Sequence, residues 1–502
     1  MGDENTSLDD TNARHLLRRT GFGAPATAVA AFTGLTRGAA ADQLLNFKTA
    51  KFKPRGTARS NEDLAEFRMH NSWVNYMITT KLQLQEKLVL FWHDHFANNN
   101  DKVGDHTRMA TQNQTFRKFC RGNFKDFVKA MNKDGAMMEF LDTVRNFKDQ
   151  PNENYARELQ ELFTLGVKDL SGSANYAQED IVQIARAFSG WNWDPRPKAH
   201  FNDYDHDYTT DYPERGDKVI YKTHGRFEDP PDVAGQGRSF IPSGGEGPGE
   251  IDLVIDIIFQ HRDSDKKNTV ARYIAGKMLE YFGHPLPAYP AKATIIDGVV
   301  SRSHFDTTFD IGALVREILV DDFFYETAAV APFGPTTVKS VKWPIDYVVS
   351  TMRLLKIRAR GRDAYINGGD YDNLQDQLTA MGQTLFEPPS VFGWNWELSW
   401  ISSATILARA NFATDIISAR GVGRYNFHPE KLIDLSLKIP SDIVKAVTDL
   451  LGVTDQLTDA EKTALADYLG AGPIDLTDFD TRDRKLNGLF ALVLQSPAYQ
   501  LH

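Results

Sequence analysis

The chain has 502 residues, of which 41% are apolar and 25% charged, a composition that excludes intrinsic disorder and favours a large folded core. The formal net charge of -10 argues against nucleic acid as a partner, because phosphate binding relies on a concentrated basic surface. No apolar run reaches the roughly 18 residues of a membrane span, and the single cysteine, Cys120, excludes an internal disulfide.

Helical periodicity runs from residue 7 to about residue 190 and again from residue 250 to the end. We therefore predict a mainly α fold, a large multi-helix domain with an irregular insertion. The expected parts are an N-terminal helical lobe at 1–190, an acidic and aromatic insertion at 191–249 and a C-terminal helical lobe at 250–502. We expect them to form one compact unit.

The N-terminal segment LLRRTGFG places Arg18 and Arg19 before a glycine turn. Arg19 is a candidate to bind a carboxylate, either that of Glu158 or that of an acidic substrate. An ion pair between helices is the simpler interpretation. Cys120, in TFRKFCRGNF, is expected to be a small buried apolar side chain.

The segment FWHDHF ends a predicted helix whose core-facing stripe includes Leu88, Trp92 and His95. His93 points roughly the opposite way, so the two histidines cannot share a metal on a regular helix. His95 is then either a hydrogen-bonded core residue or a general acid or orienting donor beside Glu158, with Asp94 helping to hold the geometry.

The most informative segment is PNENYARELQELFTLGV at 151–167, a predicted helix that begins after Pro151 and ends at Gly166. Successive 100° steps give it one buried face, formed by Tyr155, Ala156, Leu159, Leu162 and Phe163.

Asn154, Glu158 and Glu161 lie at i, i+4 and i+7 on one flank of that helix, where they can point together into a cleft. Glu153 projects from the other side, one turn from Arg157. We predict Glu158 as the main catalytic candidate, with Glu161 as a second acid and Asn154 as a substrate contact. The alternative is a solvated helix with Glu153/Arg157 and Arg157/Glu161 ion pairs.

The insertion at 191–249 is rich in Gly, Pro, Asp and Tyr, and its stretch KVIYKT predicts a small β-hairpin. Within it, 203–214 matches the ligand spacing of a calcium loop, although Tyr208 replaces the usual glycine. The candidate calcium ligands are Asp203, Asp205, Asp207 and Glu214. We expect no cofactor to be required, with Ca²⁺ as the one candidate ion. The alternative is an acidic solvated loop or a wall facing the substrate.

Tryptophans gather on two loops rich in turn residues: Trp191 and Trp193 on one, Trp394, Trp396 and Trp400 on the other. Trp191, Trp394 and Trp396 are candidates to stack on sugar rings, since an indole offers a flat surface and one hydrogen-bond donor. Equally, they can fill gaps between helices.

Seven segments, in order, resemble the domain of unknown function 1800 family of exported bacterial proteins: ARHLLRRTGFGAP, FWHDHFANN, NENYARELQELFTLGV, NYAQEDIVQIARAFSGW, HD at 206, PPSVFGWNWELSW and LVLQSPAYQ. The resemblance implies a mostly helical fold and export, so we expect a secreted or periplasmic protein whose signal peptide has been removed. It also highlights His206 and Asp207, which match the family's His-Asp (HD) motif. His206 is a candidate substrate-binding residue and Asp207 a candidate catalytic residue.

Three functional hypotheses follow. The first is a glycoside hydrolase acting on an extracellular polysaccharide, in which Glu158 and a second acid, Asp207 or Glu161, flank the scissile bond. The second is a non-catalytic cell-surface scaffold or binding protein. The third is a metal-dependent oxidoreductase using His95, His206 and Glu158. No phosphate-binding loop or serine-nucleophile motif occurs in a suitable context.

Overall fold

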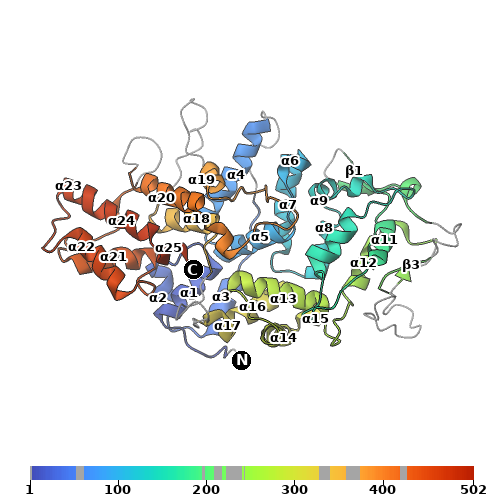
Figure 1. The fold of residues 1–502 in the computed structure, drawn as a ribbon, viewed down its shortest axis with the longest axis horizontal. Helices are drawn as coiled ribbons and strands as arrows, with labels where there is room; N and C mark the ends of the chain where they lie inside the picture. Colours follow the sequence, from blue (N-terminus) through green and yellow to red (C-terminus); the bar gives the residue numbers. More distant parts are fainter. Residues whose placement is uncertain are drawn as a thin grey trace.

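The computed structural model describes residues 3–52, 62–194, 198–208, 217–221, 240–241, 244–326, 340–357, 374–418 and 427–502. Helices dominate these residues and strands are short, which confirms the predicted mainly α fold. The helices form one elongated body, with the C-terminus near its middle (Figure 1). Among the described residues, no helix combines the length and the apolar character needed to cross a membrane.

The N-terminal helices are largely capped by short polar side chains. For example, Asp9 and Asp105 accept from backbone N–H groups in the first turns of α1 and α7. Their bounds are α1 Asp10–Thr20, α2 Ala26–Phe32, α3 Arg37–Leu45, α4 Glu62–Thr79, α5 Gln83–His95, α6 Asn100–Val103, α7 His106–Phe119, α8 Phe124–Met131, α9 Gly135–Phe140, η1 Thr143–Arg145, α10 Asn154–Glu158, η2 Leu159–Thr164 and α11 Gln178–Ala187.

The described residues of the insertion form two small antiparallel pairs. Strand β1 (Trp191–Asp194) pairs with β2 (Lys198–Phe201), and β3 (Lys218–Val219) pairs with β4 (Phe240–Ile241). The predicted β content is therefore confirmed, but KVIYKT supplies only one strand, whose partner comes from Phe240–Ile241 further along the chain. Two short 3₁₀ turns, η3 (Asp203–Asp205) and η5 (Gly247–Gly249), lie between or after these strands.

The second half of the chain is again helical, and α13 contacts α14, α16 and the π-helical turn η2. The bounds are α12 Glu250–Ile258, α13 Thr269–Phe282, α14 Ala291–Ser303, α15 Phe305–Thr308, α16 Ile311–Val320, α17 Asp322–Tyr325, α18 Pro344–Leu354, α19 Leu374–Ala380, η6 Glu397–Trp400, α20 Ser403–Ser418, η7 Pro429–Lys431, α21 Pro440–Leu451, α22 Asp459–Leu469, α23 Phe479–Thr481, η8 Arg482–Leu486, α24 Asn487–Gln495 and α25 Pro497–Gln500.

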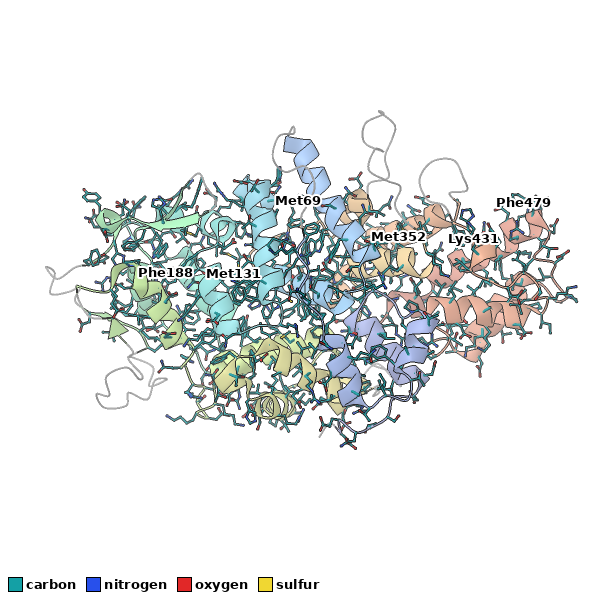
Figure 2. The ribbon with its side chains drawn as sticks, turned by 180° about the vertical axis from the view of Figure 1, so that it is seen from behind. Met69, Met131, Phe188, Met352, Lys431 and Phe479 are labelled. Atoms are coloured by element: carbon teal, nitrogen blue, oxygen red, sulfur yellow. The ribbon has the colours of Figure 1, made fainter. Side chains whose placement is uncertain are left out.

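Helices from distant parts of the sequence pack together: α3 contacts α16, and α4 contacts α18. Met69 of α4 and Met352 of α18 are fully buried near the middle of the body, while Met131 and Phe188 lie toward one end and Phe479 at the other (Figure 2). Side chains fill the space between these helices along the body. The division at residues 190 and 250 remains a prediction.

A buried ion pair links α5 and α7. Glu86 and Arg117 are at most 1% exposed and form a two-bond pair, with N–O distances of 2.7 and 2.9 Å. The indole of Trp73 in α4 donates to the same carboxylate at 2.9 Å. Removing one partner of such a pair leaves a buried charge, which is more costly than losing an exposed pair.

Replacing Glu86 by Gln keeps the side-chain shape and removes the charge opposite Arg117. We expect Glu86→Gln to lower the free energy of unfolding by about 3 kcal/mol, measured from the shift of the urea midpoint. The matched control is Lys445→Gln, which breaks the exposed Lys445–Asp449 pair and should cost no more than about 0.5 kcal/mol. Equal losses in the two variants would contradict this assignment.

Candidate functional site

The helix that carries the glutamates changes type halfway. It is α-helical over Asn154–Glu158 and π-helical over Leu159–Thr164, and it ends at Gly166, whose φ is +76°. The prediction of one regular α-helix is therefore wrong in its second half. The wider turn buries Gln160 completely and leaves Leu162 half-buried, whereas Tyr155, Ala156, Leu159 and Phe163 are buried as predicted. Such π turns occur frequently at functional sites.

Side chains from other segments satisfy the last carbonyl groups of this helix. Tyr273 of α13 donates to the carbonyl of Leu162 at 3.0 Å, and His95 donates to that of Phe163 at 3.1 Å. The amide of Asn175 donates to the carbonyls of Leu165 and Gly166 at 2.9 and 3.0 Å. A Cβ at Gly166 would lie 2.9 Å from the Tyr273 ring, so this close approach requires glycine.

Glu158 ends the α-helical part and is half-buried. Its burial and the neighbouring charge of Glu161 raise its pKa above the ordinary value, and Arg157 opposes this only in part. Its Oε2 atom is buried and has no hydrogen-bond partner within the described part of the chain. Arg157 itself donates to Glu153 at 3.2 Å and to Gln178 at 3.0 Å.

Glu161 has a different environment. It accepts a hydrogen bond of 2.7 Å from the hydroxyl of Tyr176, whose pKa is raised by burial and by this hydrogen bond. Asn154 is half-buried one turn before Glu158, and its backbone N–H donates to the side chain of Asn152. The flank predicted from the sequence therefore holds two carboxyl groups in different environments. The pKa of Glu158 is raised, and Glu161 accepts a hydrogen bond from Tyr176.

His95 is 1% exposed, as the periodicity of its helix predicts. Because the Phe163 carbonyl only accepts, Nε2 of His95 carries the proton and Nδ1 accepts from Nζ of Lys277 at 3.1 Å. Burial lowers the pKa of both groups. No hydrogen bond joins His95 to Glu158 in the described residues. His95 instead contacts the backbone of the helix that bears Glu158.

Lys277 is one of the site residues that our sequence interpretation missed, together with Tyr273, Asn175 and Tyr176. It lies on α13 four residues after Tyr273, so both project from the same face toward η2 and His95. The available signal was a lysine in the otherwise largely apolar helix NTVARYIAGKMLEYFG. Its hydrogen-bond partner, however, comes from a segment far away in the sequence.

Asp94 accepts hydrogen bonds from the tryptophan loop, the segment that carries Trp394, Trp396 and Trp400. Its Oδ1 accepts from the backbone N–H of Trp394 at 2.7 Å, and its Oδ2 accepts from the indole of Trp396 at 2.9 Å. Burial raises the pKa of Asp94 to about 6, against the opposing effect of Lys277. Gly393, with φ at +77°, lies so close to Asp94 that a Cβ would clash with its carboxylate.

The predicted sugar-stacking tryptophans lie among protein side chains. The Trp394 ring packs on His93 and Trp343, and the Trp396 ring packs on Tyr281 and Trp343. Trp191 is 8% exposed and contacts Phe201. The structure therefore places all three rings where they fill gaps between elements.

His206 and Asp207, the two residues that match the family's HD motif, each lie against a buried side chain of opposite type. Asp207 accepts from Arg186 at 2.8 Å, and Nε2 of His206 lies 3.2 Å from Glu250. Lys218 of β3 also contacts Glu250, at 2.6 Å. These contacts connect the insertion to α11 and α12.

Arg19 contacts neither Glu158 nor another carboxylate within the described residues. It donates from Nε to the carbonyl of Phe282 and from Nη2 to that of Tyr281, both at 2.6 Å. The guanidinium therefore supplies hydrogen-bond donors to the last carbonyl groups of α13.

The candidate calcium ligands have separate partners. Asp203 accepts from Tyr208, and Asp205 accepts from Asn202. Glu214 lies outside the described residues. Across the described ranges, no group of three or more His, Cys, Asp and Glu side chains is arranged to hold a metal ion.

The chain belongs to the family described as protein of unknown function (DUF1800), whose model matches residues 15–501. This match covers nearly the whole chain and confirms the resemblance predicted from the seven motifs. Comparisons with curated proteins and with solved structures each found no match.

The raised pKa of Glu158 predicts a pH-dependent stability effect. Because the folded-state pKa exceeds the unfolded value, the contribution of Glu158 to stability is complete below the unfolded pKa and is lost as pH rises through the folded pKa. Glu158→Gln removes this loss. We expect the variant to melt at a higher temperature than the unmodified protein at pH 8, but not at pH 4.

The control for this measurement is Glu153→Gln, on the same helix, where the carboxylate is paired with Arg157. It should show no such gain at pH 8. A Glu158→Gln variant whose melting temperature differs from that of the unmodified protein by the same amount at both pH values would refute the proposed environment of Glu158.

Proposed function

We propose that the protein is an exported hydrolase that cleaves glycosidic bonds of an extracellular polysaccharide by carboxylate acid–base catalysis. The observation that carries this proposal is the environment of Glu158. Its carboxyl group is half-buried, its pKa is raised, and its buried Oε2 has no described partner. A carboxyl group that remains protonated at higher pH can donate a proton to a leaving oxygen.

Glu161 supplies the second carboxyl group of the proposed mechanism. It accepts a hydrogen bond from the hydroxyl of Tyr176, which orients its carboxyl group as an acceptor. In glycoside hydrolysis, one carboxylic acid protonates the leaving oxygen while a carboxylate activates water or attacks the sugar. Glu158 and Glu161 are therefore assigned as acid and as base or nucleophile. Export rests on the family resemblance alone.

His95, Lys277 and Tyr273 are assigned as positioning residues. His95 and Tyr273 hydrogen-bond to consecutive carbonyls of the π turn that follows Glu158, and Lys277 supports His95. These contacts fix the direction of the helix end and so the placement of both glutamates. Positioning of this kind contributes to catalysis when it holds reacting groups in a productive geometry.

A second candidate is a non-catalytic cell-surface scaffold or binding protein. It is favoured by the engagement of other motif residues in internal contacts: Asp207 binds Arg186, Asp94 binds the tryptophan loop, and Arg19 binds the end of α13. In a scaffold, such residues would serve packing alone.

Turnover assays distinguish the two candidates. A panel of polysaccharides is incubated with the purified chain, and newly formed reducing ends are measured. We expect Glu158→Gln to lower kcat by at least about 100-fold, because it removes the proton donor, without lowering the melting temperature. Glu153→Gln should keep kcat within about twofold, since that paired residue lies away from the proposed chemistry.

Retained turnover in Glu158→Gln would contradict the assigned acid. Binding of a polysaccharide without turnover by the unmodified protein would instead favour the scaffold candidate.

A further inference from the structure

A second polar region lies at the C-terminal end of α13, separate from the Glu158 helix. It is a cavity of about 250 Å³, and its walls include His15, Arg18 and Arg19 of α1, His284 after α13, Tyr325 of α17 and His502. Along α13, Phe282 is nine residues beyond Tyr273, roughly 13 Å at the helical rise. The cavity therefore provides a site independent of the proposed hydrolase site.

Arg19 is the central feature of this cavity. It is 3% exposed, and its Nε and Nη2 atoms donate to the carbonyls of Phe282 and Tyr281. Its Nη1 atom has no protein partner within the described residues. Burial lowers the pKa of the guanidinium, and the carboxylates of Glu397 and Asp346 act on it only through space. A buried guanidinium without a contacting anion is costly.

The other walls add hydrogen-bonding groups. Arg18 donates to the carbonyl of Gly452 at 2.6 Å and to Asp455 at 3.3 Å. His15 donates from Nε2 to the carbonyl of Phe324 at 2.8 Å. Both ring nitrogens of His284 lie within 3.2 Å of backbone carbonyl oxygens, those of Pro285 and Phe323.

These contacts give the cavity the character of an anion site. Burial lowers the pKa of His284, whereas only its imidazolium form can donate to both neighbouring carbonyl oxygens, since a carbonyl oxygen only accepts. A negative charge in the cavity would stabilise that form and would also neutralise Arg19. The carboxylate of Asp455 is already paired with Arg18, and Glu326 is exposed.

We propose that this cavity binds the carboxylate or phosphate group of a small molecule, with Nη1 of Arg19 as its principal donor. The oxyanion would give the buried guanidinium the counter-charge that the described residues do not supply by contact. Arginine suits this role because its planar fork donates in fixed directions to carboxylate and phosphate oxygens. The volume is below the usual range of ligand pockets, so the ligand is a small acid rather than a polymer.

The experiment is a thermal-shift titration of the full chain with malonate and with inorganic phosphate, each compared with sodium chloride at equal ionic strength. A ligand that binds only the folded state raises the melting temperature as its concentration rises. We expect a rise with at least one of the two anions at about 10 mM, beyond that of chloride. The stronger response identifies the carboxylate or the phosphate as the preferred group.

Two variants test the location. Arg19→Lys keeps the charge but removes Nη1, and we expect it to weaken the anion affinity about tenfold. Because Arg19 also satisfies the end of α13, a second variant, Asn12→Asp, adds a negative charge at a half-exposed residue of the cavity wall. An acidic residue in the first turn of a helix is compatible with folding.

Asn5→Asp is the matched control, since it adds the same charge at an exposed residue that does not line the cavity. Loss of the anion response in Asn12→Asp with its retention in Asn5→Asp would support the proposal. No response beyond chloride, or an equal response in Asn12→Asp and the unmodified protein, would overturn it, whether or not Arg19→Lys folds.

Discussion

The arrangement of the candidate site depends on how the carbonyl groups at the end of the Glu158 helix find partners. A helix end leaves carbonyls without intrahelical donors, and a buried carbonyl without a donor is costly. Here the donors are the side chains of His95, Asn175 and Tyr273, which come from three other segments. The π turn, the close approach at Gly166 and the contact of α13 with this helix are consistent with the same requirement.

The same interaction recurs at the opposite end of α13. There Arg19 donates to two carbonyls, as His95 and Tyr273 do at the π turn. The last carbonyls of the Glu158 helix and of α13 thus both accept hydrogen bonds from side chains of other segments. The two helix ends differ in the charge of the donor. Neutral side chains donate to the carbonyls at the end of the Glu158 helix, one turn after a carboxyl group whose pKa is raised. A cation serves the end of α13, where the anion cavity is proposed.

Several motif residues that suggested chemistry from the sequence take part in internal ion pairs or hydrogen bonds. Asp94 holds the loop of Trp394 and Trp396, and the buried pairs of His206 and Asp207 hold the insertion on the helical body. Glu158 differs from Asp94 and Asp207, which accept hydrogen bonds from side-chain or backbone donors, because its buried Oε2 has no hydrogen-bond partner within the described residues. This contrast, rather than the motif alone, directs attention to Glu158.

The sequence by itself determined the features that depend on local patterns. These are the mainly α fold, the burial of His95 at the end of its helix, the helix end at Gly166 and the pair between Glu153 and Arg157. Periodicity, helix-ending glycines and i, i+4 spacing act within a few residues, so one sequence is sufficient to read them.

Only the tertiary structure decided the π turn after Glu158, the contact of Lys277 with His95 and the partners of Arg19. The two side-chain contacts join groups that are far apart along the chain. The π turn is a backbone conformation that donors from distant segments favour. The physical reason is that a buried polar group takes its partner from whichever segment the packing of the core brings within hydrogen-bond distance, and no local pattern records that choice.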